Sequence, residues 1–185
     1  MRLLLATLSA ILPLAACTPT EHAATQVRAV AQAATTPTLS QADAAFLDNA
    51  SRAGITEVTF GQLAREKASR QPVRDFAVRM VDEHTTMNQA LTRLATAKGI
   101  TPTTSLDTAH QNQYDALNRL AGRAFDRPYL NSQATDHAAT LRLFEDEATQ
   151  GADADVKALA AHGAPIVRRH LKEIEALGGH PAPPS

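Results

Sequence analysis

Four residues with side chains that can bind a metal ion each interrupt an apolar helical seam of this 185-residue chain. They are Glu57, His84, His137 and His170. Seam positions of a helix bundle face the other helices, so these side chains are expected to converge in the interior. Burying an unpaired carboxylate or imidazole is costly, and each therefore needs a partner. The sequence predicts an internal polar site, and no motif identifies a catalytic residue or a substrate.

The elements that must position these residues are four long helices, each with apolar residues at alternating spacings of three and four. The expected ranges are 40–71, 72–99, 128–150 and 153–177, with a shorter polar helix at 106–120. Ser40 and Asp153 are suitable N-caps, and Pro72 and Gly151 mark tight turns. No stretch alternates with period two for long enough to predict a strand. The pattern predicts an all-α fold, a four-helix bundle with a helical crossover between its second and third helices.

Counting residues from the turns predicts the level of each polar residue along the bundle. Glu57 lies about 14 residues before the first turn and His84 about 13 after it, which places them side by side. His137 lies about 14 residues before Gly151 and His170 about 19 after it, an offset of some 7 Å at about 1.5 Å per residue. Pro165 is expected to loosen the last helix and change this offset.

The N-terminus predicts export. Arg2 precedes the apolar stretch Leu3–Leu14, which is shorter than the roughly 20 residues that span a bilayer. The following Leu14–Cys17 resembles the bacterial lipobox, in which the cysteine is lipidated and becomes the first mature residue. We therefore expect residues 1–16 to be a lipoprotein signal peptide, the alternative being an ordinary signal peptide that contains a cysteine. Thr18 favours the outer membrane over the inner one, with the domain facing the periplasm.

The rest of the chain divides into three parts on composition. Residues 17–39 are expected to be a flexible tether rich in Ala, Thr and Pro, residues 40–177 the bundle, and residues 178–185 a disordered tail. Cys17 is the only cysteine, so no disulfide can form within the mature chain, and its stability must come from packing. The lipid on Cys17 makes the membrane an expected partner without any spanning helix.

Composition and motifs exclude several classes of function. The chain has 18 Lys and Arg against 19 Asp and Glu, and no basic stripe that would bind nucleic acid. It has no Trp, and few aromatic residues on which bases or sugars could stack. A glycine-rich phosphate loop and a nucleophile elbow are both absent. Neither a protein partner nor an oligomeric state is predicted.

Several short motifs resemble a known family in their order and spacing. They are Glu57–Ala68, Val73–Ala77, Met80–His84, Phe125-Asp126 with Tyr129, then His137, Leu141 and Phe144, and finally Pro165 with His170-Leu171. Over about residues 40–177 the chain resembles the bacterial periplasmic and outer-membrane proteins of domain of unknown function 4142, grouped with the ferritin-like superfamily. The resemblance implies a ferritin-like up-and-down four-helix bundle and no assigned activity.

Ferritin-like di-iron proteins use one Glu from each of two helices and a Glu-x-x-His motif from each of the other two. This sequence contains no Glu-x-x-His, which argues against a di-iron oxidase or ferroxidase. One Glu and three His suit a single divalent transition-metal ion such as Zn, or alternatively Cu, Fe or Ni.

Two readings of the polar residues remain open on the sequence. The favoured one is a non-enzymatic envelope module for binding or stress, in which the histidines form a buried structural network. The alternative is a mononuclear metal-binding protein or metalloenzyme. His162, Asp82 and Asp136 lie beside the seams and are expected to be peripheral to such a site.

Overall fold

The computed structural model describes residues 39–182, which contain five α-helices and no strand. The helices are α2 (Gln41–Lys67), α3 (Gln71–Ala97), α4 (Thr108–Asn118), α5 (Arg123–Gln150) and α6 (Ala154–Ala176). The expected signal peptide, the lipidation site Cys17 and all of the tether except Leu39 lie outside the described residues. None of the helices described is both long enough and apolar enough to cross a bilayer.

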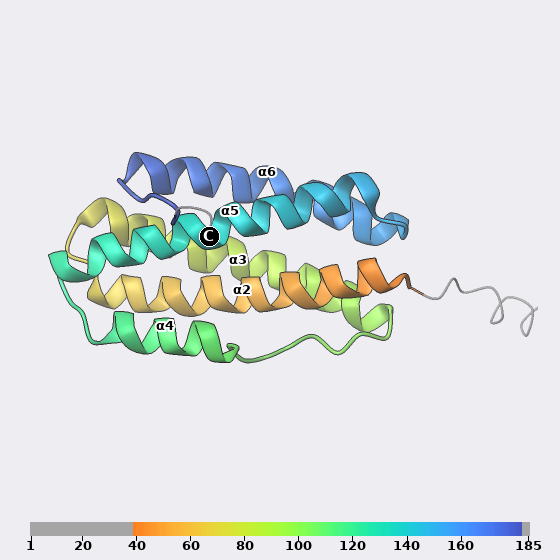
Figure 1. Cartoon of the computed structure of the whole chain (residues 1–185), viewed down its shortest axis with the longest axis horizontal. Coiled ribbons are helices and arrows are strands. Elements are labelled where there is room, and N and C mark those ends of the chain that lie inside the picture. Colours follow the sequence, from red (N-terminus) through yellow and green to blue (C-terminus); the bar gives the residue numbers. More distant parts are fainter. Residues whose placement is uncertain (1–38, 183–185) are drawn as a thin grey trace, which may run out of the picture. The chain divides into compact units, whose positions relative to one another are not determined.

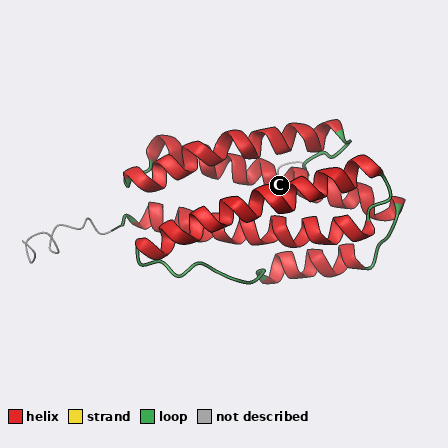
Figure 2. Cartoon of the chain, turned by 180° about the vertical axis from the view of Figure 1, so that it is seen from behind, coloured by secondary structure: helices red, strands yellow, loops and turns green. Residues whose placement is uncertain are grey.

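The four long helices form two antiparallel hairpins, α2 with α3 and α5 with α6, which pack against each other (Figure 1). α2 lies against α5, and α3 against α6. The crossover carries α4 along the outside of α2 and α5, as the view from behind also shows (Figure 2). Because of this crossover, α3 and α5 run in the same direction, and up-and-down alternation holds within each hairpin. The predicted all-α bundle with a helical crossover is confirmed.

Side-chain caps define the helix starts where the sequence predicts them. The Ser40 hydroxyl accepts a hydrogen bond from the Asp43 amide at 3.0 Å and begins α2. The Asp153 carboxylate accepts from the amides of Asp155 and Val156 and begins α6. Gly99, with φ of 79°, follows the end of α3, because a left-handed backbone is accessible to glycine at little cost.

The expected start of the third long helix is wrong by five residues. α5 begins at Arg123, and Pro128 lies inside it, where only one backbone hydrogen bond is lost. The earlier start follows from Gly122, whose amide donates to the Lys67 carbonyl at 2.9 Å and whose φ of 61° turns the chain into the helix. The long-range contact with Lys67 leaves no local signal in the sequence.

The tail expected to be disordered from Gly178 is held against α5 as far as Ala182. The His180 amide donates to the Asn131 side chain at 3.1 Å, and the Ala182 amide to the Thr135 hydroxyl at 2.9 Å. Gly179 is buried, and it packs so closely that a Cβ there would meet the Leu130 carbonyl oxygen at 2.6 Å. Prolines and glycines signalled a helix stop correctly, but they did not reveal these contacts.

The interior contains a polar layer between two apolar ones. One apolar cluster includes Phe60, Phe76, Phe125, Tyr129 and Ile174. The other includes Phe46, Leu91, Phe144, Val156 and Ala160. Along each long helix, the buried Glu or His of the predicted site lies between residues of these two clusters. The bundle therefore holds these four polar residues away from either end.

A buried carboxyl pair near the α5–α6 turn gives a pH-dependent prediction. The Asp43 carboxylate accepts from the amides of Ala152 and Asp153, at 2.9 and 3.2 Å. Glu147 lies beside it, 7% exposed, and burial together with Asp43 raises the pKa of Glu147 to about 7. Because this pKa exceeds the ordinary value of 4.5, protonated Glu147 contributes to the stability of the folded chain. That contribution is complete below pH 4.5 and is lost as pH rises through 7.

Glu147→Gln keeps a donor towards Asp43 at every pH and is expected to be relatively more stable than wild type at pH 8 than at pH 5. Urea unfolding at both pH values measures this difference, with Glu145→Gln as a control, because Glu145 is half-exposed on the same helix and pairs with Arg168 instead of Asp43. An unchanged difference between variant and wild type at the two pH values would contradict this account.

Candidate metal centre

Three of the four predicted residues converge in the polar layer. His84 from α3, His137 from α5 and His170 from α6 are each at most 2% exposed. One ring nitrogen from each lies within 4.8 Å of the other two. His84 Nε2 and His170 Nδ1 are 3.2 Å apart. This distance is that of a hydrogen bond between the two rings, and it also fits two nitrogens bound at about 2.0–2.1 Å to one tetrahedral ion, which would be roughly 3.3 Å apart.

The backbone fixes the orientation of the His137 ring. His137 Nδ1 lies 3.0 Å from the carbonyl oxygen of Gln133, one helical turn earlier. A carbonyl only accepts, so Nδ1 carries the proton and the lone pair of the neutral ring is on Nε2. That Nε2 atom is buried and has no hydrogen-bond partner. A buried lone pair left in this way is available to a ligand.

A carboxylate fixes the orientation of His170. His170 Nε2 lies 3.0 Å from an oxygen of Glu83, which also pairs with Arg169. The carboxylate accepts, so His170 donates from Nε2 and directs the lone pair of Nδ1 towards His84. A histidine that donates to a carboxylate from one nitrogen and offers the other is typical of protein metal sites.

The electrostatic environment keeps all three rings neutral at pH 7. Burial lowers the pKa of His84 well below its ordinary 6.5, and the other two histidines lower it further. Burial and His170 lower the pKa of His137 to about 3. Burial also lowers the pKa of His170, although Glu83 opposes this shift. Metal binding requires neutral imidazole, and no proton has to be removed from these rings first.

Glu57 lies behind His137 rather than with the three converging nitrogens. Its Oε1 is 3.3 Å from His137 Nδ1, but that N–H donates to Gln133. Both Glu57 oxygens are buried without a hydrogen-bond partner. Burial raises the pKa of Glu57 well above its ordinary value, and Asp136 raises it further. The expected four-residue set thus divides into three histidines and a carboxyl that contacts one of them from the far side.

The three peripheral residues lie in different surroundings. Asp82 is exposed on α3. Asp136 is half-buried on α5, and burial raises its pKa to about 6. His162 is exposed on α6 and lines one cavity, and Asp136 lines another.

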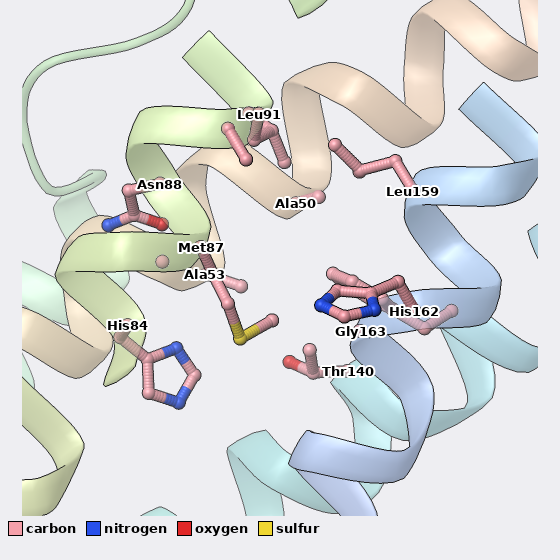
Figure 3. Close-up of a pocket in the computed structure, with 13 residues that line it drawn as sticks. Ala50, Ala53, His84, Met87, Asn88, Leu91, Thr140, Leu159, His162 and Gly163 are labelled. Carbon is pink, nitrogen blue, oxygen red and sulfur yellow. The ribbon is translucent and has the colours of Figure 1, made fainter. Parts of the chain in front are cut away.

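The two cavities differ in the character of their walls. The polar cavity, about 250 Å³, is lined by ionisable side chains that include Glu57, Asp107, His110 and Asp136. The apolar cavity, about 260 Å³, is lined by Ala50, Ala53, Gly54, His84, Met87, Asn88, Ala90, Leu91, Thr140, Phe144, Leu159, His162 and Gly163. Figure 3 shows His84, Met87, Thr140 and His162 around the apolar cavity. Ionisable groups therefore line the cavity at Glu57, and mostly apolar groups line the cavity at His84.

The expected offset of His170 does not separate it from the other rings. The ring centroids of His137 and His170 are 5.6 Å apart, and those of His84 and His170 are 5.1 Å apart. α6 runs through Pro165 without ending, and its side chains lean towards the N-terminus of the helix. The tilt of the side chains and the length of the imidazole rings together bridge the offset between His137 and His170 that residue counting predicts.

Sequence reasoning missed the residues that orient the rings. Glu83 is next to His84 in the sequence, and its carboxylate accepts hydrogen bonds from both His170 and Arg169. A signal for it exists, because Glu83-His84 and Arg169-His170 place opposite charges beside two facing seam histidines. The Gln133 carbonyl that orients His137 has no such signal, since any residue supplies one.

Comparison with known proteins supports the fold. A family model described as a domain of unknown function, DUF4142, matches residues 28–177. A DUF305 fragment from Deinococcus radiodurans has a similar structure, with a TM-score of 0.68, 14% identity, and coverage of 77% of this chain and 99% of that one. A DUF305 protein from Streptomyces coelicolor, provisionally described as secreted, has a TM-score of 0.65 and 14% identity, and the match covers 77% of this chain and 98% of that one. No curated protein matches the chain.

Proposed function

The chain belongs to the DUF4142 family, whose function is unknown, and we propose that it binds one transition-metal ion through His84, His137 and His170. The observation that carries this proposal is His137 Nε2, a buried and unpartnered lone pair that faces two other neutral imidazoles. A purely structural polar layer would leave this atom unsatisfied, at a cost of about 1–3 kcal/mol. A bound ion removes that cost.

The donor set limits the metals that fit. Neutral imidazoles suit Zn, Cu, Fe and Ni, and the cluster includes no thiolate. Three protein ligands leave one position of a tetrahedral ion open, as in zinc sites that bind water or a substrate. The geometry therefore supports metal binding with an open position, and it assigns no reaction to the centre.

Equilibrium dialysis of untagged protein against Zn²⁺, followed by metal analysis, tests this proposal. We expect about one ion per chain for wild type, with three ligands and one centre. His137→Ala should lose this ion, because it removes the unpartnered lone pair. His110→Ala is the matched control, since His110 pairs with Asp107 outside the cluster. Equal metal content in wild type and His137→Ala would contradict the proposal.

We also propose that the protein is anchored to the cell envelope through lipid on Cys17, with the bundle facing the periplasm and the outer membrane as its site. The lipobox-like Leu14–Cys17 behind an apolar stretch supports this assignment. The provisional description of one structural neighbour as secreted agrees with export. Attachment through a lipid requires no membrane-spanning helix.

Cys17→Ser is expected to abolish lipidation and leave uncleaved precursor or soluble protein. Membrane fractionation together with the intact mass of the protein measures this outcome. A Cys17→Ser protein that still fractionates with membranes and still carries acyl chains would contradict the anchor.

A further inference from the structure

The apolar cavity ends at a proposed metal ligand. It lies between α2, α3, α5 and α6, and His84 and Met87 are part of its wall (Figure 3). His162, exposed on α6, is at its rim. A path of this kind leads from the surface to one of the three histidines without passing the carboxyls near Glu57.

Small residues shape the walls of the cavity. Gly163 allows the Phe144 ring to approach α6, because a Cβ on Gly163 would meet that ring at 2.4 Å. A Cβ on Gly54 would likewise meet the Asn88 side chain at 1.8 Å. Ala50 and Ala53 complete the α2 wall without filling the volume. The glycines therefore let Asn88 and Phe144 pack close to α2 and α6, while the two alanines leave the α2 side of the cavity unfilled.

The chemistry of the lining selects for neutral molecules. Only four residues of the lining carry a polar side chain: His84, Asn88, Thr140 and His162. No Asp, Glu, Lys or Arg contributes to the wall. An ionised ligand would lose its hydration there without a partner of opposite charge, which is costly. Charged species are better accommodated in the polar cavity, which Arg52, Glu57 and Asp136 help to line.

The volume sets the size of the ligand. An apolar cavity of about 150 Å³ stays dry and binds benzene. The apolar cavity here, about 260 Å³, has room for one substituted ring or a short aliphatic chain. We propose that it binds one small uncharged organic molecule against His84. The role of this molecule rests on the proposed function, because it would lie beside the open position of a metal ion bound to His84.

The first experiment uses metal-free protein, so that it does not depend on the metal. Indole is the neutral probe and benzoate the charged one, and thermal unfolding at increasing concentration of each detects binding. We expect indole to raise Tm and benzoate to leave it unchanged. Ala50→Leu should abolish the indole effect by filling the cavity.

A second variant keeps the test valid if Ala50→Leu fails to fold. Leu159→Ala enlarges the cavity from the α6 side and should extend binding to a larger neutral probe, 1-methylnaphthalene. Leu143→Ala is the matched control, because Leu143 lines the polar cavity and not the apolar one. Equal response of Leu159→Ala and Leu143→Ala, or no response of wild type to indole, would overturn the inference.

The role beside the metal is tested with Co²⁺-loaded protein. Indole is expected to shift the visible absorption of bound Co²⁺ in wild type and not in Ala50→Leu. Indole binding without any Co²⁺ binding would refute the metal centre and leave the cavity as a ligand site. Co²⁺ binding without an indole-dependent shift would refute the ligand beside the metal and leave the centre intact.

Discussion

Zn²⁺ added to the metal-free protein is expected to raise its free energy of unfolding by about 4 kcal/mol when the free ion is about 1,000-fold above its dissociation constant. The gain follows because the three histidines form a site only in the folded chain. His84→Ala and His137→Ala should each remove this gain while keeping the helical content. Thermal or urea unfolding across a series of free Zn²⁺ concentrations measures it.

Glu57→Gln separates the three-histidine site from the four-residue site expected on the sequence. Glu57 contacts His137 at Nδ1, which donates to Gln133, and not at the unpartnered Nε2, so its amide variant should retain the Zn²⁺-dependent gain. If the histidines form only a buried structural network, the opposite result is expected for their alanine variants. His84→Ala and His137→Ala would then destabilise the metal-free protein by about 1–3 kcal/mol, and Zn²⁺ would change nothing.

Asp126→Ala is expected to reduce the free energy of unfolding by about 3 kcal/mol, because it leaves several donors without a partner. Asp126 is 4% exposed and accepts the Ser69 amide and hydroxyl, both at 2.8 Å, and the Arg70 amide at 3.1 Å. Although burial alone would raise the pKa of Asp126, the bonds from Ser69 and Arg70 lower it below its ordinary value. This carboxylate ties the α2–α3 turn to the first turns of α5.

Urea unfolding at pH 7 measures the effect, with two comparisons. Asp126→Asn keeps an acceptor and should cost less than Asp126→Ala. Asp75→Ala removes an exposed acid on α3, bonded only to the Gln71 side chain, and should cost little. The Asp126 contribution should fade as pH falls below 3.8, since its folded pKa is depressed. A loss of unfolding free energy for Asp126→Ala no larger than that for Asp75→Ala would contradict a stabilising role of the Asp126 hydrogen bonds.

The seam residues could be predicted because helical periodicity is a strong local signal. Spacings of three and four put His84, His137 and His170 on inward faces, and loop positions put them at similar levels. The rotation of each helix about its axis is not local information. It decides that His137 offers Nε2 to the centre and Nδ1 to Gln133 and Glu57, and it therefore removes Glu57 from the converging group.

Long-range contacts explain the other differences. Gly122 and Lys67 are joined by a backbone hydrogen bond that sets the start of α5, and Asn131 fixes the chain after α6. Neither hydrogen bond could be predicted from the sequence, because each joins residues far apart in the chain and no local pattern marks them. The apolar cavity was also missed, since it depends on which small residues of separate helices face one another.

The most direct test of the account is a crystal structure of metal-loaded protein with anomalous scattering recorded at the absorption edge of the bound metal. The account predicts a single strong peak inside the bundle, about 2.0–2.2 Å from His84 Nε2, His137 Nε2 and His170 Nδ1. A peak in the polar cavity beside Glu57 and Asp136, or peaks at surface residues alone, would contradict the three-histidine centre.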